Sequence, residues 1–390
     1  MPRQSMPAAW AIALFATIAP TNALAEDAQI DYMTAPYEIE RVLDHGSRPD
    51  WSFDGTRLAF TEADTRNTPA SEIDLATGEV RCLTCHLGED RDVTRIYYLQ
   101  DDSFLLLAPR RRDADGTRPS GQELYWMPAT LGEVQPLEAN AFGEIAISRN
   151  TGAGGTLIAW GDASTGKSLV RMARLVVEDG EASLLDTRTL YDSTEPPTLA
   201  GVTVAETYGF SRGDSAVTFY TIMDRGDTLD GEMVEVDIAS GKVTSLYSDP
   251  SHNETHLFAD ERFGLEESNR ASDPQGQWRG LSSHGEGFMA FMQRKVDWPL
   301  PVPETLRSYA PAGPNAGFNR PFDLYVVDRE DPSSPRRLTW FSDLGAEAHQ
   351  SVISHDGKRF AFALKTREAV GFAGRAGLYV GTFGESGDAQ

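Results

Sequence analysis

A short motif of cysteine and histidine is the most distinctive chemical feature of the chain. Cys82-Leu83-Thr84-Cys85-His86 has the C-x-x-C-H spacing of a c-type haem attachment site, in which both thiols bond to the porphyrin and the histidine binds iron. The chain has two cysteines in all, so the pair could instead form a local disulfide that closes a very small loop. We expect the disulfide and no cofactor, and keep haem c at Cys82, Cys85 and His86 as the alternative.

A second segment, His252-Asn253-Glu254-Thr255-His256, contains two histidines. The distance between their side chains depends on whether the segment is a helix or a strand. Pro250 precedes the segment and argues against a helix. On a strand, alternate residues share a face, so His252, Glu254 and His256 should point the same way. The two histidines would then lie roughly 13 Å apart, too far to bind one metal ion without ligands from elsewhere.

A third segment, His349-Gln350 followed by His355, has side chains that could bind a divalent metal. It can share a metal with His252 or His256 only if the fold brings distant strands together. The alternative is that all these groups are polar residues with water partners.

Glu266 and Arg270 form a fourth candidate site, because a carboxylate beside a guanidinium can bind a sugar or a peptide terminus. The alternative is a solvated loop with internal salt links. No Gly-x-Ser-x-Gly motif occurs near the pair, so the segment has no serine hydrolase signature.

The elements that must position these residues are repeated β-hairpins. Trp51-Ser52-Phe53-Asp54-Gly55 leads into a second apolar run, as does Ile353-Ser354-His355-Asp356-Gly357, and Asp-Gly is a strong hairpin-turn signal. Weaker copies of this pattern are found around 98–107, 147–160, 209–220 and 258–265. A second hairpin accompanies at least three copies, at 72–84, 233–246 and 322–339.

Two hairpins per unit make a four-stranded sheet, and units that recur about every fifty residues predict an all-β β-propeller. The units are 48–92, 93–140, 141–200, 201–250, 251–342 and 343–384, which gives six blades. The fifth is long, and a possible extra copy at 282–291 makes seven blades the alternative. Tyr37–Leu43 should close the ring by joining the last sheet, and the proline-rich stretch 296–319 should be a long loop insertion.

The segments WSFDGTRLAF, EIDLATGEV, SHDGKRFAF and DLYVVDREDPSSPRRLT resemble the WD40-like repeats of TolB-type propellers over most of residues 37–384. A weaker resemblance in general plan is to oligogalacturonate lyase propellers, a family in which histidines and a glutamine hold a metal that binds the uronate carboxylate. This second resemblance implies metal ligands at His349 and Gln350. In a propeller the inner strands face one central channel, so His256 and His349 could meet there.

Composition and the first residues indicate where the protein works. Acidic residues number 59 against 35 basic ones, and the net charge of −24 argues against nucleic acid and anionic lipid surfaces as partners. Arg3, the apolar run from Ala8 to Pro20 and the Ala23-Leu24-Ala25 cleavage pattern predict a signal peptide over residues 1–25. The remainder, 26–390, should then be a single propeller domain in the periplasm or outside the cell, with no integral membrane segment.

The sequence therefore predicts a TolB-like propeller that binds a ligand or an envelope protein. A metal-dependent carbohydrate lyase is the first alternative, with ligands among His252, His256, His349 and Gln350. A c-type haem protein is the second. The carbohydrate or protein partner is not specified by any motif.

Overall fold

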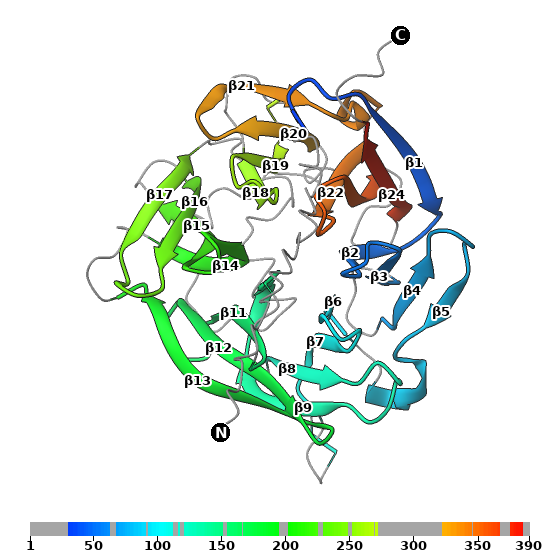
Figure 1. The fold of residues 1–390 in the computed structure, drawn as a ribbon, viewed down its shortest axis with the longest axis vertical. Coiled ribbons are helices and arrows are strands. Elements are labelled where there is room, and N and C mark those ends of the chain that lie inside the picture. The colour runs from blue at the N-terminus through cyan, green and yellow to red at the C-terminus, as the bar shows by residue number, and fades with distance from the viewer. Residues whose placement is uncertain are drawn as a thin grey trace, which may run out of the picture.

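The computed structural model describes residues 30–384 apart from 63–67, 91–92, 112–115, 118–120, 151–153, 166, 195–201, 225–228, 249–251, 269, 272–321, 345 and 367–374. Within these residues the chain forms six four-stranded sheets, arranged as blades around a central channel (Figure 1). Neighbouring strands in every blade are antiparallel, as expected for consecutive hairpins. The all-β six-bladed prediction is confirmed.

In each of the first three blades the strands run outward from the channel in chain order. Blade 1 is β2 (Ser47–Trp51), β3 (Arg57–Thr61), β4 (Ala70–Asp74) and β5 (Val80–Cys82). Blade 2 is β6 (Arg95–Tyr98), β7 (Phe104–Pro109), β8 (Gln122–Met127) and β9 (Gln135–Asn140). Blade 3 is β10 (Phe142–Ile147), β11 (Thr156–Asp162), β12 (Leu169–Glu178) and β13 (Glu181–Asp192).

Blades 4 and 5 follow the same order, and blade 6 combines both ends of the chain. Blade 4 is β14 (Val202–Ser211), β15 (Ala216–Asp224), β16 (Leu229–Asp237) and β17 (Val243–Ser248). Blade 5 is β18 (His252–Leu257), β19 (Phe263–Ser268), β20 (Asp323–Asp328) and β21 (Asp331–Arg337). Blade 6 is β22 (Ala346–Ile353), β23 (Arg359–Thr366), β24 (Arg375–Phe383) and β1 (Tyr37–Leu43). In the part of the chain that the structure describes, two short 3₁₀ helices, η1 (Cys85–Asp90) and η4 (Phe341–Leu344), lie between blades.

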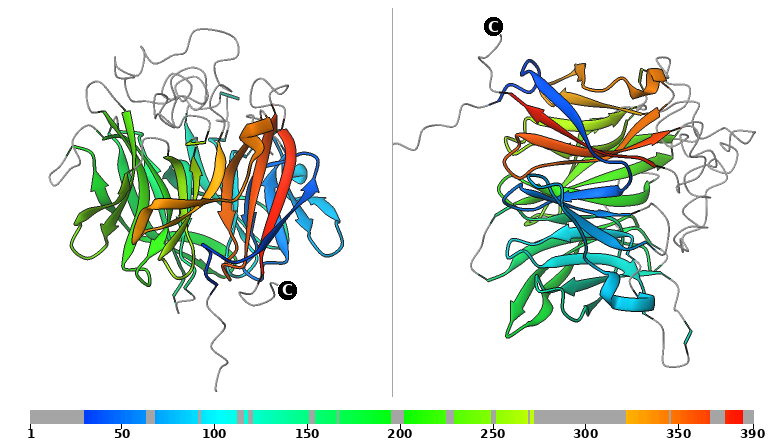
Figure 2. Two further views of the ribbon diagram at one scale, coloured as in Figure 1. Left: turned by 90° about the horizontal axis from the view of Figure 1, so that it is seen from above. Right: turned by 90° about the vertical axis from the view of Figure 1, so that its right-hand side faces the viewer.

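The N-terminal strand closes the ring. β1 pairs antiparallel with β24, with Tyr37 opposite Phe383 and Glu40 opposite Val380, so the last sheet gains its fourth strand from the start of the chain (Figure 1). This confirms the predicted closure. Each described blade contacts the next around the ring, including blade 6 with blade 1. The alternative of seven blades is therefore wrong. Figure 2 shows the sheets from the side, with strands of neighbouring sheets standing next to one another.

In blades 1 and 6 the turn after the inner strand is built from the repeat residues. In blade 1 the Ser52 hydroxyl donates to Asp54 Oδ1 at 2.6 Å, and the same oxygen accepts from Thr56 N at 3.0 Å. Ser354 and Asp356 make the equivalent bond at 2.5 Å in blade 6. These local bonds satisfy the turn without help from the rest of the fold, which explains why the Ser-x-Asp-Gly pattern identifies blades in the sequence.

The core lies between neighbouring blades. Trp51, Leu58 and Phe60 of blade 1 are buried against residues of blade 6, including Ala361 and Leu378. Burial of alternate strand residues from both sheets in one cluster means that neither blade has a complete core alone. The ring fixes the six inner strand ends around the channel for this reason.

Two predicted segments fall outside the described residues: the signal peptide at 1–25 and the loop at 296–319. The position of the predicted loop in the chain order is nevertheless clear. β19 and β20 are neighbours in one sheet, so the residues between Ser268 and Asp323 are an insertion within blade 5. The extra hairpin considered at 282–291 belongs to that insertion. Among the described residues, no helix has the length and apolar character needed to cross a membrane.

Candidate functional site

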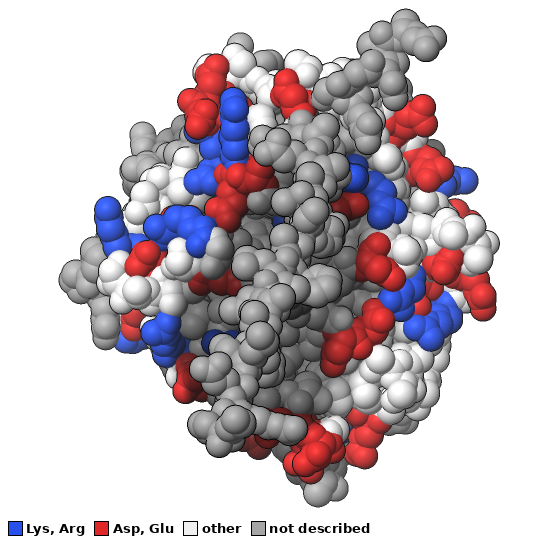
Figure 3. Space-filling view, viewed as in Figure 1, with Lys and Arg blue, Asp and Glu red and all other residues white. Residues whose placement is uncertain are grey.

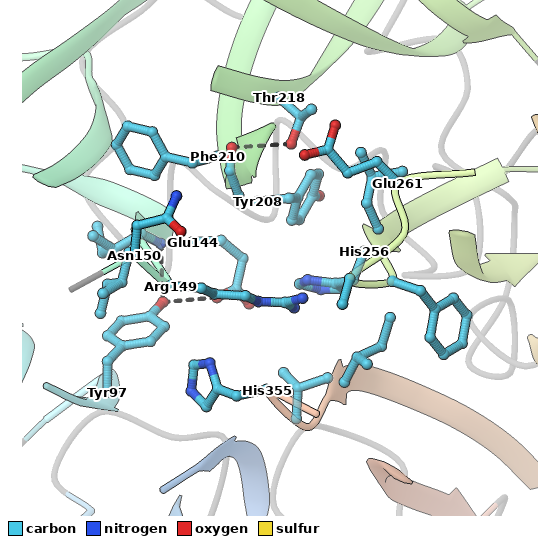
Figure 4. Close-up of a pocket in the computed structure, with 18 of the residues that line it drawn as sticks. Tyr97, Glu144, Arg149, Asn150, Tyr208, Phe210, Thr218, His256, Glu261 and His355 are labelled. Atoms are coloured by element: carbon cyan, nitrogen blue, oxygen red, sulfur yellow. Dashed lines mark hydrogen bonds between the residues drawn. The ribbon is translucent and has the colours of Figure 1, made fainter. Parts of the chain in front are cut away.

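A cavity of about 350 Å³ lies in the central channel, close to the ends of the inner strands. Every blade contributes to its lining, and Figure 4 shows side chains from different blades pointing toward one another across it. Blades 1 to 6 each contribute at least one lining residue, and examples in this order are Asp50, Tyr97, Ile147, Tyr208, His256 and Val352. The ring thus brings together groups that are up to about three hundred residues apart in sequence.

Arg149 is the one arginine or lysine among the described residues that line the cavity. It follows β10, and its side chain extends across the cavity toward His256 (Figure 4). It is solvent-accessible, yet the protein around it lowers its pKa through desolvation. The guanidinium makes no hydrogen bond or ion pair with any residue in the described part of the chain. The guanidinium can therefore pair with an anionic group that enters the cavity.

Two histidines of the same cavity each have one buried ring nitrogen without a hydrogen-bond partner, although His355 also makes a hydrogen bond with the backbone of Trp51. His256 Nε2 and His355 Nδ1 are buried, and neither bonds to a described residue. Burial, with Arg149 as a further cause, lowers the pKa of His256 to about 3 and that of His355 to about 4. Both rings are therefore neutral at physiological pH, so each presents one N–H donor and one acceptor nitrogen. The ring of His355 is held in place by stacking on Phe53, with 3.9 Å between centroids.

Most acidic side chains of the cavity are already bonded to donors. Glu144 forms an ion pair with Arg95 and accepts from the Tyr97 hydroxyl at 2.7 Å (Figure 4). Asp214 of the turn in blade 4 accepts from the Ser148 hydroxyl of blade 3 at 2.5 Å. These carboxylates are satisfied by their own neighbours and leave Arg149 without a counter-charge in contact.

Asp50 is the acid whose ionisation changes near neutral pH. Desolvation raises its pKa to about 7, although Tyr98 N donates to Oδ2 at 2.8 Å and the Arg149 charge opposes the shift. At neutral pH this carboxyl is therefore part neutral and part ionised. The charge of the cavity consequently depends on pH through one group.

The structure places the predicted residues His349 and Gln350 in contacts between blades. His349 Nδ1 lies 2.5 Å from Glu267 Oε2, and Ser351 N donates to Glu267 Oε1 at 2.7 Å. Gln350 Oε1 accepts from the Ser47 hydroxyl at 3.0 Å and from Arg48 N at 3.1 Å. His349 and Gln350 thus join blade 6 to blades 5 and 1, and neither lines the cavity that contains His256.

The predicted geometry of the other histidine pair is also altered. A β-bulge lies between His252 and Thr255 in the pairing of β18 with β19, so the strict alternation that would place His252 and His256 on one face is broken. Across the described residues, no group of three or more His, Cys, Asp or Glu side chains is arranged to hold a metal ion. The side chain of His252 is not among those described.

Glu266 and Arg270 bind each other. Arg270 Nη2 donates to Glu266 Oε1 at 2.5 Å, and the guanidinium lies 4.9 Å from the Tyr325 ring centroid. Glu266 is fully buried on β19, so the prediction of a solvated loop is wrong for this residue, while the internal ion pair is present. A carboxylate already paired in this way offers less to a ligand than a free one.

Cys82 and Cys85 form a disulfide at the outer edge of blade 1. His86 Nε2 lies 3.1 Å from the carbonyl oxygen of Gly132. Sulfurs bonded to each other cannot form thioether bonds to haem, so the disulfide and haem attachment exclude each other at this site.

No protein-family model and no curated protein matches the chain. Solved structures do, at low identity. An oligogalacturonate lyase in complex with manganese is 13% identical and has a TM-score of 0.46, with 92% of this chain and 96% of that chain covered. TolB from Acinetobacter baumannii is 12% identical with a TM-score of 0.31, over 90% of this chain and 55% of that chain. A putative TolB from Agrobacterium tumefaciens is 11% identical with a TM-score of 0.33, over 90% and 98%. The chain is thus similar in fold to TolB proteins and to an oligogalacturonate lyase, the two kinds of protein that its repeats resemble.

Sequence reasoning missed Arg149 and Asp50, and a signal for the first was available. Arg149 follows Ser148 in the turn after the inner strand, at the position that lies between Ser and Asp in blades 1 and 6. The residues at this position in blades 1 to 6 are Phe53, Gln100, Arg149, Arg212, Ala259 and His355. Three of them, Arg149, Ala259 and His355, line the cavity. Comparison of this one repeat position between blades would have given six candidates, of which these three line the cavity.

Proposed function

We propose that this protein is a periplasmic or secreted propeller that binds a ligand, or a short segment of an envelope protein, in the channel cavity. The observation that carries the proposal is a cavity lined by all six blades, in which buried polar atoms of His256 and His355 have no partner among the described residues. Concave sites with a few converging polar groups are the usual form of small-ligand sites in proteins.

The proposal is tested by binding measurements on a variant with a filled cavity. Ala259 is exposed at the cavity wall, so Ala259→Trp should occupy the space without replacing a core residue. Short peptides and oligosaccharides would be titrated into the chain beginning at Glu26 and followed by ligand-observed NMR. We expect at least one class to bind the wild-type protein with one site and to lose binding in Ala259→Trp.

Glu40→Ala is the matched control, because Glu40 is exposed on β1 at the outer edge of blade 6. It should bind as the wild type does. Binding that survives Ala259→Trp, or a panel in which nothing binds, would overturn the proposal. Circular dichroism of each variant would establish that the fold is intact.

The predicted location has its own test. Expression of the full chain in a Gram-negative host should yield a periplasmic product with an intact mass that begins at Glu26. A product that keeps residues 1–25 in the cytoplasm would contradict it.

A further inference from the structure

We propose that the cavity binds the carboxylate group of its ligand on Arg149, with His256 and His355 as neutral hydrogen-bond partners. The inference rests on the proposed function, since it names the chemistry of the ligand at the same site. It is carried by three side chains from blades 3, 5 and 6 that converge on one space (Figure 4).

The comparison of Arg149 with Arg212 shows what is unusual about the site. Both residues occupy the same position of the repeat turn, in blades 3 and 4. Arg212 is paired, with Nε 3.0 Å from Glu235 Oε1 and Nη2 3.0 Å from Asp237 Oδ2. Arg149 has no such partner among the described residues, and it lines the cavity, whereas Arg212 does not. A guanidinium that lines a cavity and has no ion pair of its own can pair with an anionic group of a ligand.

The two histidines make a second, independent observation. His256 Nε2 and His355 Nδ1 are buried atoms that no described residue satisfies. Buried polar groups in folded proteins are nearly always hydrogen-bonded, so unsatisfied ones in a cavity indicate a missing partner. Since both rings stay neutral, they can bond to a ligand without adding charge.

The charge of the wall favours a single negative charge over a phosphate. Arg149 is the one unpaired cation among the described lining residues, and Glu144 and Asp214 are held by their own donors. A dianion would be compensated by one guanidinium only in part, and it would face Asp50 and Glu261 on the same wall. A carboxylate is planar, carries one charge and matches the two parallel N–H donors of a guanidinium.

The test uses pairs of probes that differ only in the carboxylate. N-acetylglycine is compared with N-acetylglycinamide, and glucuronate with glucose, by NMR titration of the mature protein; inorganic phosphate is a third probe. We expect one acid to bind at least about tenfold more tightly than its neutral match, as one charge-assisted contact allows. The pair that shows the preference tells whether the natural carboxylate is that of a peptide terminus or of an acidic sugar.

Arg149→Met should abolish the preference, and Arg149→Lys should retain part of it. Arg212→Met is the matched control, because it removes the equivalent arginine of blade 4, and it should leave the preference unchanged. Equal binding of acid and neutral match, or a preference that persists in Arg149→Met, would overturn the inference.

The outcomes separate this inference from the proposed function. If both members of a pair bind equally and Ala259→Trp blocks both, the cavity is a binding site and the role of Arg149 is refuted. If an acid preference survives Ala259→Trp, the site lies elsewhere and both proposals fail. Tighter binding of phosphate than of either acid would refute the carboxylate assignment alone.

Discussion

Removal of the Glu267 carboxylate should weaken the contact between blades 5 and 6. Glu267 is fully buried on β19, and it bonds to His349 at 2.5 Å and to Ser351 N at 2.7 Å on β22. In Glu267→Ala both groups on β22 lose this bond, and neither can reach bulk water without opening the interface. Hydrogen bonds to a charged group contribute about 1.5–3 kcal/mol each, so we expect a loss of roughly 3–5 kcal/mol in the free energy of unfolding.

Urea denaturation of the wild type and the variant, followed by tryptophan fluorescence, measures this loss. A domain is typically stable by about 5–15 kcal/mol, so the midpoint should fall substantially while the slope with urea stays constant. Glu267→Gln should lose less, because its carbonyl oxygen can still accept from Ser351 N. Glu38→Ala on the exposed face of β1 should change the stability by less than about 0.5 kcal/mol.

A loss below about 1 kcal/mol in Glu267→Ala would refute the reasoning. It would mean that His349 and Ser351 find other partners, and that the blades are held by apolar packing alone. If the free energy of unfolding depended on urea with a different slope, while the fluorescence of the folded state was unchanged, the ring would be partly open in the variant.

Three further predictions follow from the site and from the cysteine pair. Binding of an acid probe should weaken several-fold from pH 6 to pH 8, because Asp50, with a pKa of about 7, gains a charge that competes for Arg149; Asp50→Asn should make the affinity independent of pH over this range. The mature chain should show a mass two hydrogens below that of the reduced polypeptide and no visible absorption band, whereas a mass raised by one haem with a Soret band would refute the Cys82–Cys85 disulfide. Elemental analysis should find no stoichiometric divalent metal; a metal that is present and is lost in His349→Ala would support the lyase alternative instead.

The blades and their closure were predictable because their signals are local. Ser52-x-Asp54-Gly55 forms its own turn through bonds between residues two to five apart, and the same pattern recurs at Ser354. A hairpin of this kind fixes its own register, so repeated copies indicate repeated sheets. The unpaired strand at Tyr37–Leu43 was assigned to the last blade because an edge strand needs a partner, and β24 supplies it.

The candidate site was predicted much less well. His256 was predicted to lie at the channel, but the metal prediction joined it to His349, which contacts Glu267. Which inner-strand residues meet depends on how far each strand extends along the channel and on bulges such as the one after His252. A single bulge changes the face of every residue beyond it, and no sequence pattern here reports it.

The sequence by itself determined the hairpins and the closing strand, because these depend on residues close in the chain or on simple repetition; the choice between six and seven blades was left to the structure. Only the tertiary structure decided that Arg149 stays unpaired while Arg212, at the same repeat position, binds Glu235 and Asp237. The reason is that the repeats have the same local structure in every blade but have different neighbours at the channel. There, each side chain meets the residues that five other blades present, and those contacts exist only once the ring has closed.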